Sequence, residues 1–150
     1  MKSSFLIILI TSFGLFTSCK KDKEVIAPTP LYQRIGGEAV VTDIIDQTIT
    51  NIITDNRINF FFAALATDPT KAQTLRKNLI DQLGQLSGGN QQYTGRTMTA
   101  VHTGMNINTA QFAAFIEDFT RAIDSKNLPA AEKAELIALY QNLSADIIGK

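Results

Sequence analysis

Residues with apolar side chains recur three and four positions apart, and this constrains the fold more than any other sequence feature. The first long series, which includes one threonine, consists of Val41, Ile44, Ile45, Thr48, Ile49, Ile52 and Ile53. This spacing places the side chains on one face of an α-helix, whereas a half-buried strand requires strict alternation of apolar and polar residues. Many members are β-branched and would suit a strand, but the alternation is absent. We therefore predict a helix here.

Three later series have the same period. They consist of Leu75, Leu79, Leu83 and Leu86, of Phe112, Phe115, Ile116, Phe119 and Ile123, and of Leu136, Leu139, Tyr140, Leu143 and Ile147. Each series follows a pattern that is typical of a helix start: Asp68-Pro69, then Asn108 with Gln111, then Pro129. No convincing pair of strands occurs, so the sequence predicts an all-α domain.

Glycines separate the predicted helices. Thr29-Pro30 begins a short helix that Gly36-Gly37 ends. Gly88-Gly89 ends the leucine series and opens an irregular polar stretch, residues 88–108, with one or two helical turns around residues 96–102. A long irregular stretch inside a compact domain is usually functional or disordered. Its apolar and aromatic side chains indicate that it is ordered against another part of the molecule.

Composition narrows the range of functions. The chain has 150 residues, of which 45% are hydrophobic, enough for one domain with a sizeable core. Its 14 basic and 14 acidic residues leave no net charge, which argues against binding nucleic acid because phosphate contacts need a basic excess. A single cysteine, Cys19, and a single histidine, His102, exclude a disulfide within the chain, a zinc finger and an HExxH site.

The N-terminal residues are typical of an export signal. Lys2 precedes an uncharged apolar run, residues 5–16, which is too short to span a membrane and suits the core of a signal peptide. The run ends just before Cys19, and this junction resembles a bacterial lipoprotein cleavage site, with Phe16 in place of the usual leucine. A plain secretory signal, or a membrane anchor with an incidental cysteine, is the alternative.

The resemblance to a lipoprotein implies a division of the chain. Residues 1–18 would be removed as the signal peptide, residues 19–29 would form a tether, and residues 30–150 would fold. Lipid chains on Cys19 would hold the protein at a membrane of the bacterial cell envelope, on the periplasmic or the outer-membrane face. Lys20, directly after the cysteine, favours the outer membrane.

Four blocks of residues resemble the group I truncated haemoglobins in order and spacing. They are residues 31–37 (LYQRIGG), 55–62 (DNRINFFF), 88–98, with GG followed by YTGRTM, and 101–107 (VHTGMNI). The resemblance extends over residues 30–149. It implies an all-α, two-over-two helical sandwich that encloses one haem b.

The resemblance also implies that His102 is the proximal ligand of the haem iron. His102 lies on a short segment between two long apolar helices, where a ring nitrogen can reach an iron atom. Taken by itself, a lone histidine is more often a core or surface residue without a ligand role. The sequence has no second histidine for two-histidine coordination, so we expect a five-coordinate ferrous haem.

Further residues of the expected haem site follow from the same resemblance. Phe62 falls on the aromatic residue that wedges against the porphyrin, with Phe61 packed beside it. Tyr93 and Arg96 fall where a phenol and a guanidinium can meet the haem propionates. The proximal wall is expected to contain Met98, Val101, Met105, Ile107 and Phe112. As residues alone, the apolar members are equally consistent with an ordinary core, and Arg96 with an exposed surface.

The distal side departs from the family pattern. Ile49 falls where many members have a tyrosine that donates a hydrogen bond to the bound gas, and Thr48 replaces that tyrosine's aromatic neighbour. Leu75 and Leu79 are expected over the iron, which leaves Thr48 and Gln82 as the polar candidates. Loss of the donor predicts roughly ten- to a hundredfold faster release of oxygen. Binding of carbon monoxide and nitric oxide should change less.

Three functions from different classes fit these features. The first is reversible binding of a diatomic gas (O2, NO or CO) by a haem protein at the cell envelope. The second is a nitric oxide dioxygenase or weak peroxidase, which would need a separate reductase because the chain has no flavin or nicotinamide motif. The third is a haem carrier or structural lipoprotein. We expect a monomeric gas-binding protein rather than a dedicated enzyme.

Overall fold

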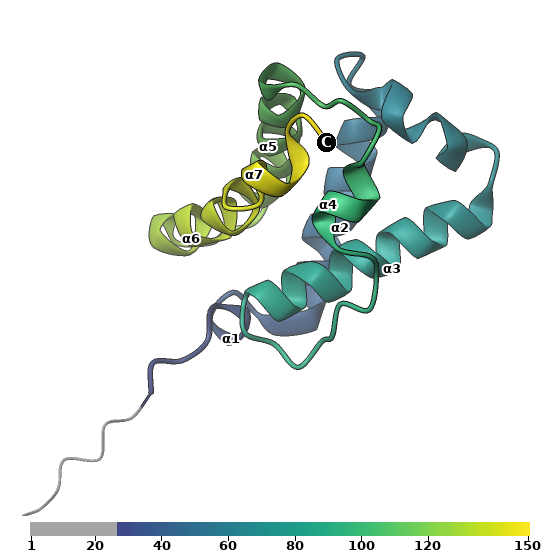
Figure 1. The fold of residues 1–150 in the computed structure, drawn as a ribbon. Helices are drawn as coiled ribbons and strands as arrows, with labels where there is room; N and C mark the ends of the chain where they lie inside the picture. Colours follow the sequence, from purple (N-terminus) through teal and green to yellow (C-terminus); the bar gives the residue numbers. More distant parts are fainter. Residues whose placement is uncertain (1–26) are drawn as a thin grey trace, which may run out of the picture.

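The structure, a computed structural model, describes residues 27–150 and contains only helices and loops in that range (Figure 1). In chain order the elements are α1 (Leu31–Arg34), α2 (Gly37–Thr54), the 3-10 helix η1 (Asn59–Ala66), α3 (Pro69–Leu86), α4 (Met98–His102), α5 (Thr109–Asp124), α6 (Ala130–Gln141) and α7 (Ser144–Ile147). The all-α prediction is confirmed. The predicted signal peptide and Cys19 lie outside the described residues. No helix in the described part of the chain is long and apolar enough to cross a membrane.

Two pairs of long helices form the body of the domain. Helix α2 packs against α3, helix α5 packs against α6, and the contact between α2 and α5 joins the two pairs. The short helix α4 crosses in front of α2 in Figure 1 and packs against α7. This is the expected two-over-two arrangement, with α4 held by the C-terminal end of the chain.

The helix starts follow the local signals in the sequence. The Asp68 carboxylate accepts hydrogen bonds from the backbone N–H groups of Thr70 and Lys71, which begins α3. Asn108 and Gln111 form a complete capping box at the start of α5. These interactions satisfy backbone donors that have no partner within the helix.

Three details differ from the prediction. Pro30 precedes α1 instead of occupying its first position. The series predicted to form one last helix is divided at residues 142–143 into α6 and α7, and α7 turns to pack against α4. Element η1 was not predicted, because its residues have no helical period.

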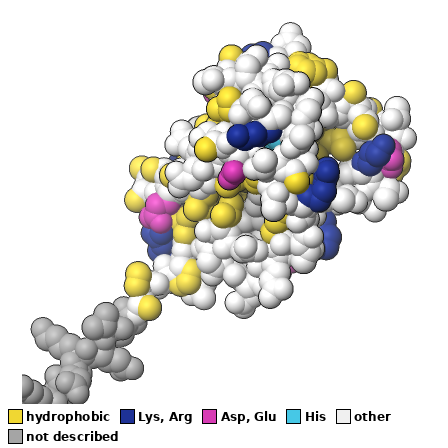
Figure 2. All heavy atoms as spheres, in the orientation of Figure 1, with side chains coloured by type: hydrophobic (Ala, Val, Ile, Leu, Met, Phe, Trp, Pro, Cys, Tyr) yellow, Lys and Arg dark blue, Asp and Glu magenta, His cyan; other side chains and the backbone are white. Residues whose placement is uncertain are grey.

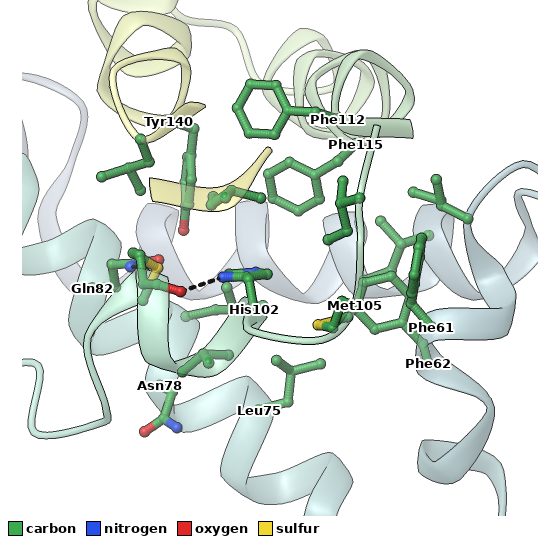
Figure 3. A pocket seen from close by; sticks show the side chains of 18 of the residues that line it. Phe61, Phe62, Leu75, Asn78, Gln82, His102, Met105, Phe112, Phe115 and Tyr140 are labelled. Carbon is green, nitrogen blue, oxygen red and sulfur yellow. Dashed lines mark hydrogen bonds between the residues drawn. The ribbon is translucent and has the colours of Figure 1, made fainter. Parts of the chain in front are cut away.

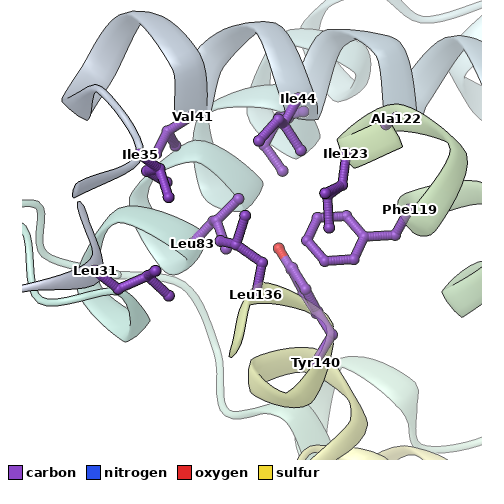
Figure 4. Close-up of a cluster of buried hydrophobic side chains, with 11 residues drawn as sticks. Leu31, Ile35, Val41, Ile44, Leu83, Phe119, Ala122, Ile123, Leu136 and Tyr140 are labelled. Atoms are coloured by element: carbon purple, nitrogen blue, oxygen red, sulfur yellow. The ribbon is translucent and has the colours of Figure 1, made fainter. Parts of the chain in front are cut away.

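The main core lies between the two helix pairs (Figure 4). Its buried residues are Leu31, Ile35, Val41, Ile44, Ile45, Leu83, Phe119, Ala122, Ile123, Leu136 and Tyr140. They come from α1, the turn after it, α2, α3, α5 and α6, so every long helix contributes. Full burial of one large apolar side chain contributes about 1.5–3 kcal/mol, and this core therefore positions the four long helices.

A second, smaller cluster lies at the other end of α2. Ile52, Ile58 and Ala114 are buried there, and Phe61, Phe62 and Phe115 pack around them but remain partly exposed. Beyond this cluster, η1, α3, α4 and α5 surround a space, where many apolar side chains are only half-buried. This space is the candidate functional site.

Charged side chains are scattered over the face shown in Figure 2, singly or in small groups of both signs. Elsewhere on the surface or on this face, several charged side chains of the described residues form ion pairs, among them Arg76 with Asp46 at 2.6 Å and Lys133 with Asp124 at 3.0 Å. Such exposed pairs contribute about 0–1 kcal/mol each. On this face no basic patch gathers that would suit a nucleic acid.

Candidate functional site

An apolar cavity of about 300 Å³ lies between α3 and α4 and is closed at the back by α5 and α6. Its wall is formed by Ile52, Ile58, Phe61, Phe62, Leu65, Leu75, Asn78, Leu79, Gln82, Tyr93, Met98, Val101, His102, Met105, Ile107, Gln111, Phe112, Phe115, Tyr140, Leu143 and Ile147. Most of these side chains are aliphatic or aromatic, so the cavity suits a large apolar ligand.

His102 lies at the cavity with one ring nitrogen already engaged (Figure 3). Its Nδ1 atom is 2.7 Å from the carbonyl oxygen of Met98, one turn earlier on α4. A carbonyl oxygen only accepts hydrogen bonds, so Nδ1 must carry the proton and Nε2 keeps its lone pair. A histidine oriented in this way is prepared to bind a metal through Nε2.

Several interactions hold the short helix α4 in place. The Thr97 hydroxyl accepts a hydrogen bond from the Ala100 N–H at 3.3 Å and caps the helix start. The Thr99 hydroxyl donates to the Asp146 carboxylate on α7 at 3.0 Å. Because five residues make a weak helix on their own, these tertiary contacts fix the position of His102.

The end of the chain secures the loop that follows α4. The Gly149 N–H donates to the Ile107 carbonyl at 2.9 Å, and the Asn106 N–H donates to the Lys150 carbonyl at 2.8 Å. Gly104 has a positive φ of 85°, a conformation that glycine adopts without strain and that turns the chain away from α4. The loop therefore brings Met105 and Ile107 back to the cavity wall.

Helix α3 forms the opposite wall. Leu75 and Leu79 face the cavity, together with the amide side chains of Asn78 and Gln82. The Gln82 amide donates to the sulfur of Met98 at 3.0 Å, which links the two walls. Leu75, Leu79 and Gln82, which the sequence predicted for the distal side, thus line this wall of the cavity.

Tyr93 reaches the cavity from the irregular stretch before α4. Its N–H donates to the Gln85 side chain at 2.7 Å, and its hydroxyl donates to the Arg96 carbonyl at 2.7 Å. Burial raises the pKa of the Tyr93 hydroxyl above its ordinary value, so the group remains a donor at neutral pH. Phe61, Phe62, Met98, Val101, Met105, Ile107 and Phe112 also lie in the wall, as expected.

Three of the expected site residues lie outside the cavity wall. Thr48 is fully buried between helices, and its hydroxyl donates back to the Ile44 carbonyl at 2.7 Å. Ile49 packs against the main core and lines a separate hollow beside η1. Arg96 is exposed, because the loop directs only its backbone carbonyl toward Tyr93. Thr48 is thus not available as a polar group of the cavity.

The sequence prediction missed several members of the wall. They are Ile52, Ile58, Leu65, Asn78, Gln111, Phe115, Tyr140, Leu143 and Ile147. Periodicity had placed Phe115 and Tyr140 on buried helix faces, but it does not distinguish a core contact from a cavity wall. Asn78 and Leu65 do not belong to any of the apolar series, so periodicity gave no indication that they are buried.

Comparison with known proteins identifies the family. A family model described as a bacterial-like globin matches residues 30–148. The chain belongs to this family. Among curated proteins, this globin is 29% identical to a group 1 truncated hemoglobin of Tetrahymena pyriformis, over 82% of its own length and 98% of that protein. It is also 29% identical to a group 1 truncated hemoglobin of a Nostoc species, over 80% and 98%.

Solved structures show the same fold. The crystal structure of the Tetrahymena pyriformis truncated hemoglobin in its Fe(III) form has a TM-score of 0.74 and 26% identity, covering 81% of this globin and 100% of that chain. A 2/2 hemoglobin of Synechococcus, solved with covalently attached heme, has a TM-score of 0.71 and 21% identity, covering 80% and 98%. The resemblance to group I truncated haemoglobins and the two-over-two fold are therefore confirmed.

The globin family implies a haem, and the residues present fit one. The cavity offers apolar surfaces on both sides and one imidazole whose Nε2 lone pair is available, which is the donor set of a histidine-ligated haem. In residues 27–150 no cluster of three or more His, Cys, Asp or Glu could hold a bare metal ion instead. A single nitrogen ligand suffices when the porphyrin supplies the other four.

Proposed function

We propose that this globin binds one haem b in the cavity through Nε2 of His102 and reversibly binds a diatomic gas there. The haem supplies an iron centre with a free coordination position for the gas. The observation that carries the proposal is the hydrogen bond from His102 Nδ1 to the Met98 carbonyl, at the edge of an apolar cavity. It supports both the tautomer and the ring orientation that ligation requires.

The protein's own contribution is positioning and exclusion of water. The Met98 carbonyl orients the imidazole and increases its basicity. Leu75 and Leu79 on α3, with Phe61 and Phe62 on η1, give an apolar wall that keeps water away from the gas site. Exclusion of water slows oxidation of the ferrous state, which favours reversible binding.

A haem titration tests the proposal. Every described core and cavity residue lies between Leu31 and Ile147, so the chain from residue 27 contains the whole folding unit. We expect its absorption spectrum to saturate at one haem per chain and to shift when carbon monoxide is added to the ferrous form. His102→Ala should abolish both the five-coordinate histidine spectrum and tight binding.

Gln92→Ala is the control. Gln92 is exposed, lies in the loop before α4, and is outside the cavity wall. This variant should bind haem with the wild-type spectrum. An unchanged spectrum in His102→Ala would contradict the proposal, and so would failure of the wild-type chain to bind haem. Circular dichroism confirms that each variant is folded.

We further propose that the protein is anchored at the bacterial envelope through lipid on Cys19. This rests on the sequence of residues 5–19, which lie outside the described residues. Mass spectrometry of the protein extracted from membranes should find diacylglycerol on Cys19, and Cys19→Ser should release the protein into the soluble fraction. Membrane retention of unlipidated protein would contradict the proposal.

A further inference from the structure

Residues 144–150, which comprise α7 and the three residues after it, connect two parts of the site that are distant in sequence. In Figure 1 they lead from α6 toward α4, against which α7 packs. They contribute Ile147 to the cavity wall. They also form hydrogen bonds with α4 and with the loop after it, the segment that carries His102. We call residues 144–150 the clasp.

One hydrogen bond joins the clasp to α4 itself. The Thr99 hydroxyl donates to the Asp146 carboxylate at 3.0 Å. Thr99 lies three residues before His102 on the same five-residue helix. A helix of this length is weak on its own. Its direction, and with it the direction of the imidazole, therefore depends on contacts of this kind.

Two main-chain hydrogen bonds join the clasp to the loop after α4. The Gly149 N–H donates to the Ile107 carbonyl at 2.9 Å. The Lys150 carbonyl accepts from the Asn106 N–H at 2.8 Å. Gly149 has a positive φ of 72°, a conformation that glycine adopts without strain. Because the clasp bonds to residues before and after His102, it holds this segment from both sides along the chain.

The clasp lies outside both hydrophobic clusters. Its buried residue is Ile147, which is 8% exposed and belongs neither to the main core nor to the smaller cluster. Opening of the clasp should therefore free α4 while the four long helices remain packed.

The place of Ile147 in the cavity wall couples the clasp to a bound ligand. A molecule that fills the cavity meets Ile147 as well as His102. Both contacts are lost when the clasp opens. Ligand binding and closure of the clasp must therefore favour each other, by the same free energy in both directions.

We propose that the clasp positions His102 for the haem iron and sets how long the haem stays bound, with Asp146 as a positioning residue. The inference rests on the proposed haem function. The closed clasp holds the imidazole toward the cavity, and the open clasp lets α4 move away from it. Haem release then requires opening of the clasp and not unfolding of the main core.

The first test compares Asp146→Ala and Asp146→Asn with the wild-type chain from residue 27, all loaded with haem. Alanine removes the acceptor, whereas the side-chain carbonyl of asparagine can still accept from Thr99. Alanine should speed haem dissociation about two- to tenfold, the effect of losing one hydrogen bond, and asparagine should preserve the wild-type rate. Transfer of haem to an excess of apomyoglobin measures these rates.

Gly149→Pro is a stronger variant of the same kind. Proline has no N–H to donate to Ile107, and its ring fixes φ near −65°, which is incompatible with the observed 72°. Haem should dissociate from this variant at least as fast as from Asp146→Ala. Circular dichroism confirms that the long helices are retained.

Asp124→Ala is the matched control for the aspartate variants. Asp124 is also exposed, and its carboxylate accepts a hydrogen bond from Lys133 at 3.0 Å, outside the clasp and the cavity wall. This control should leave the haem dissociation rate unchanged.

A second readout is hydrogen exchange. In haem-free protein, the amides of Val101 and Thr103, which bond within α4, should exchange faster in Asp146→Ala than in the wild type. Amides in the middle of α2 and α5 should not change. Adding haem to the wild-type chain should slow exchange of the Gly149 amide, because a filled cavity favours the closed clasp.

The outcomes separate this inference from the proposed function. If the wild-type chain binds haem but Asp146→Ala releases it at the wild-type rate, the inference is overturned and the proposed function stands. Equal acceleration by Asp146→Asn or Asp124→Ala also overturns it, because that result indicates an effect of charge. Exchange at Gly149 that haem does not slow overturns it as well. A wild-type chain that binds no haem overturns both.

Discussion

The Nδ1 atom of His102 lies 2.7 Å from the carbonyl oxygen of Met98, so the backbone of α4 itself orients the imidazole. The acceptor is a main-chain atom and remains in any side-chain substitution that preserves the helix. The orientation of the proposed iron ligand therefore depends on the integrity of a five-residue helix. Removing an interaction that holds α4 should therefore speed haem dissociation strongly, even where it lowers the free energy of unfolding only slightly.

Thr97→Ala tests this dependence. The substitution removes the side-chain cap of α4, which should cost about 0.5–1 kcal/mol of stability. Haem dissociation, measured by transfer to an excess of apomyoglobin, should become faster because the helix that carries His102 frays. Asn108→Ala removes the cap of α5 and is the control. If both variants accelerate haem loss equally, the claim that haem retention depends specifically on α4 is wrong.

Phe119 and Phe62 lie in different surroundings, so replacing each with alanine should lower the free energy of unfolding by different amounts. Phe119 is fully buried in the main core, and Phe119→Ala should lower the free energy of unfolding by about 3–5 kcal/mol. Phe62 is half-buried at the cavity, so Phe62→Ala should cost clearly less in the haem-free chain. With haem bound, Phe62→Ala should instead speed haem loss. Urea unfolding with and without haem measures both effects. An equal loss of unfolding free energy in the two haem-free variants would contradict the placement of Phe119 in the core and Phe62 at the cavity.

Asp118 on α5 gives a pH-dependent prediction. Its side chain is shielded from solvent, it pairs with Arg121, and its Oδ2 has no partner in the described part of the chain. Burial raises the pKa of this carboxyl above its ordinary value, and the Arg121 guanidinium opposes the shift only in part. Other charged groups nearby are Asp55, Arg57 and Glu117.

A raised pKa means that the folded state binds the Asp118 proton more tightly than the unfolded state. The stability that this proton contributes is present below the unfolded pKa and is lost as the pH rises through the folded pKa. Asp118→Asn, which is neutral at all pH values, should therefore stabilise the protein by about 1 kcal/mol at pH 7. The gain should disappear as the pH falls toward the ordinary pKa of a free aspartate, about 3.9. Thermal unfolding over this range measures it, and a destabilised variant at pH 7 would refute it.

Local signals predicted the helix starts well because each is complete within a few residues. Asp68-Pro69 and the Asn108–Gln111 pair contain both the cap and the group that it satisfies. The division of the last helix was not predictable in the same way. Leu143 and Ile147 continue the helical spacing, and the break at residues 142–143 follows from packing of α7 on α4, a contact distant in sequence.

The location of a residue at the cavity was predictable where a specific motif surrounds it, as one does around His102. It was not predictable where helix rotation decides the outcome. Thr48 and Ile49 are adjacent on α2, and the packing of α2 on α5 buries the first and turns the second to another hollow. Tyr140 had only the signal of a buried helix position, which does not reveal where its hydroxyl points.

The most direct test of the central claim, that His102 is the iron ligand, is the absorption spectrum of haem-loaded His102→Gly with and without free imidazole. Removing the side chain leaves room at the cavity for imidazole to replace it. We predict that the ferrous spectrum of the variant lacks the histidine-ligated form and regains it on addition of imidazole. A variant that keeps the wild-type spectrum without imidazole would show that another group binds the iron, and would contradict the claim.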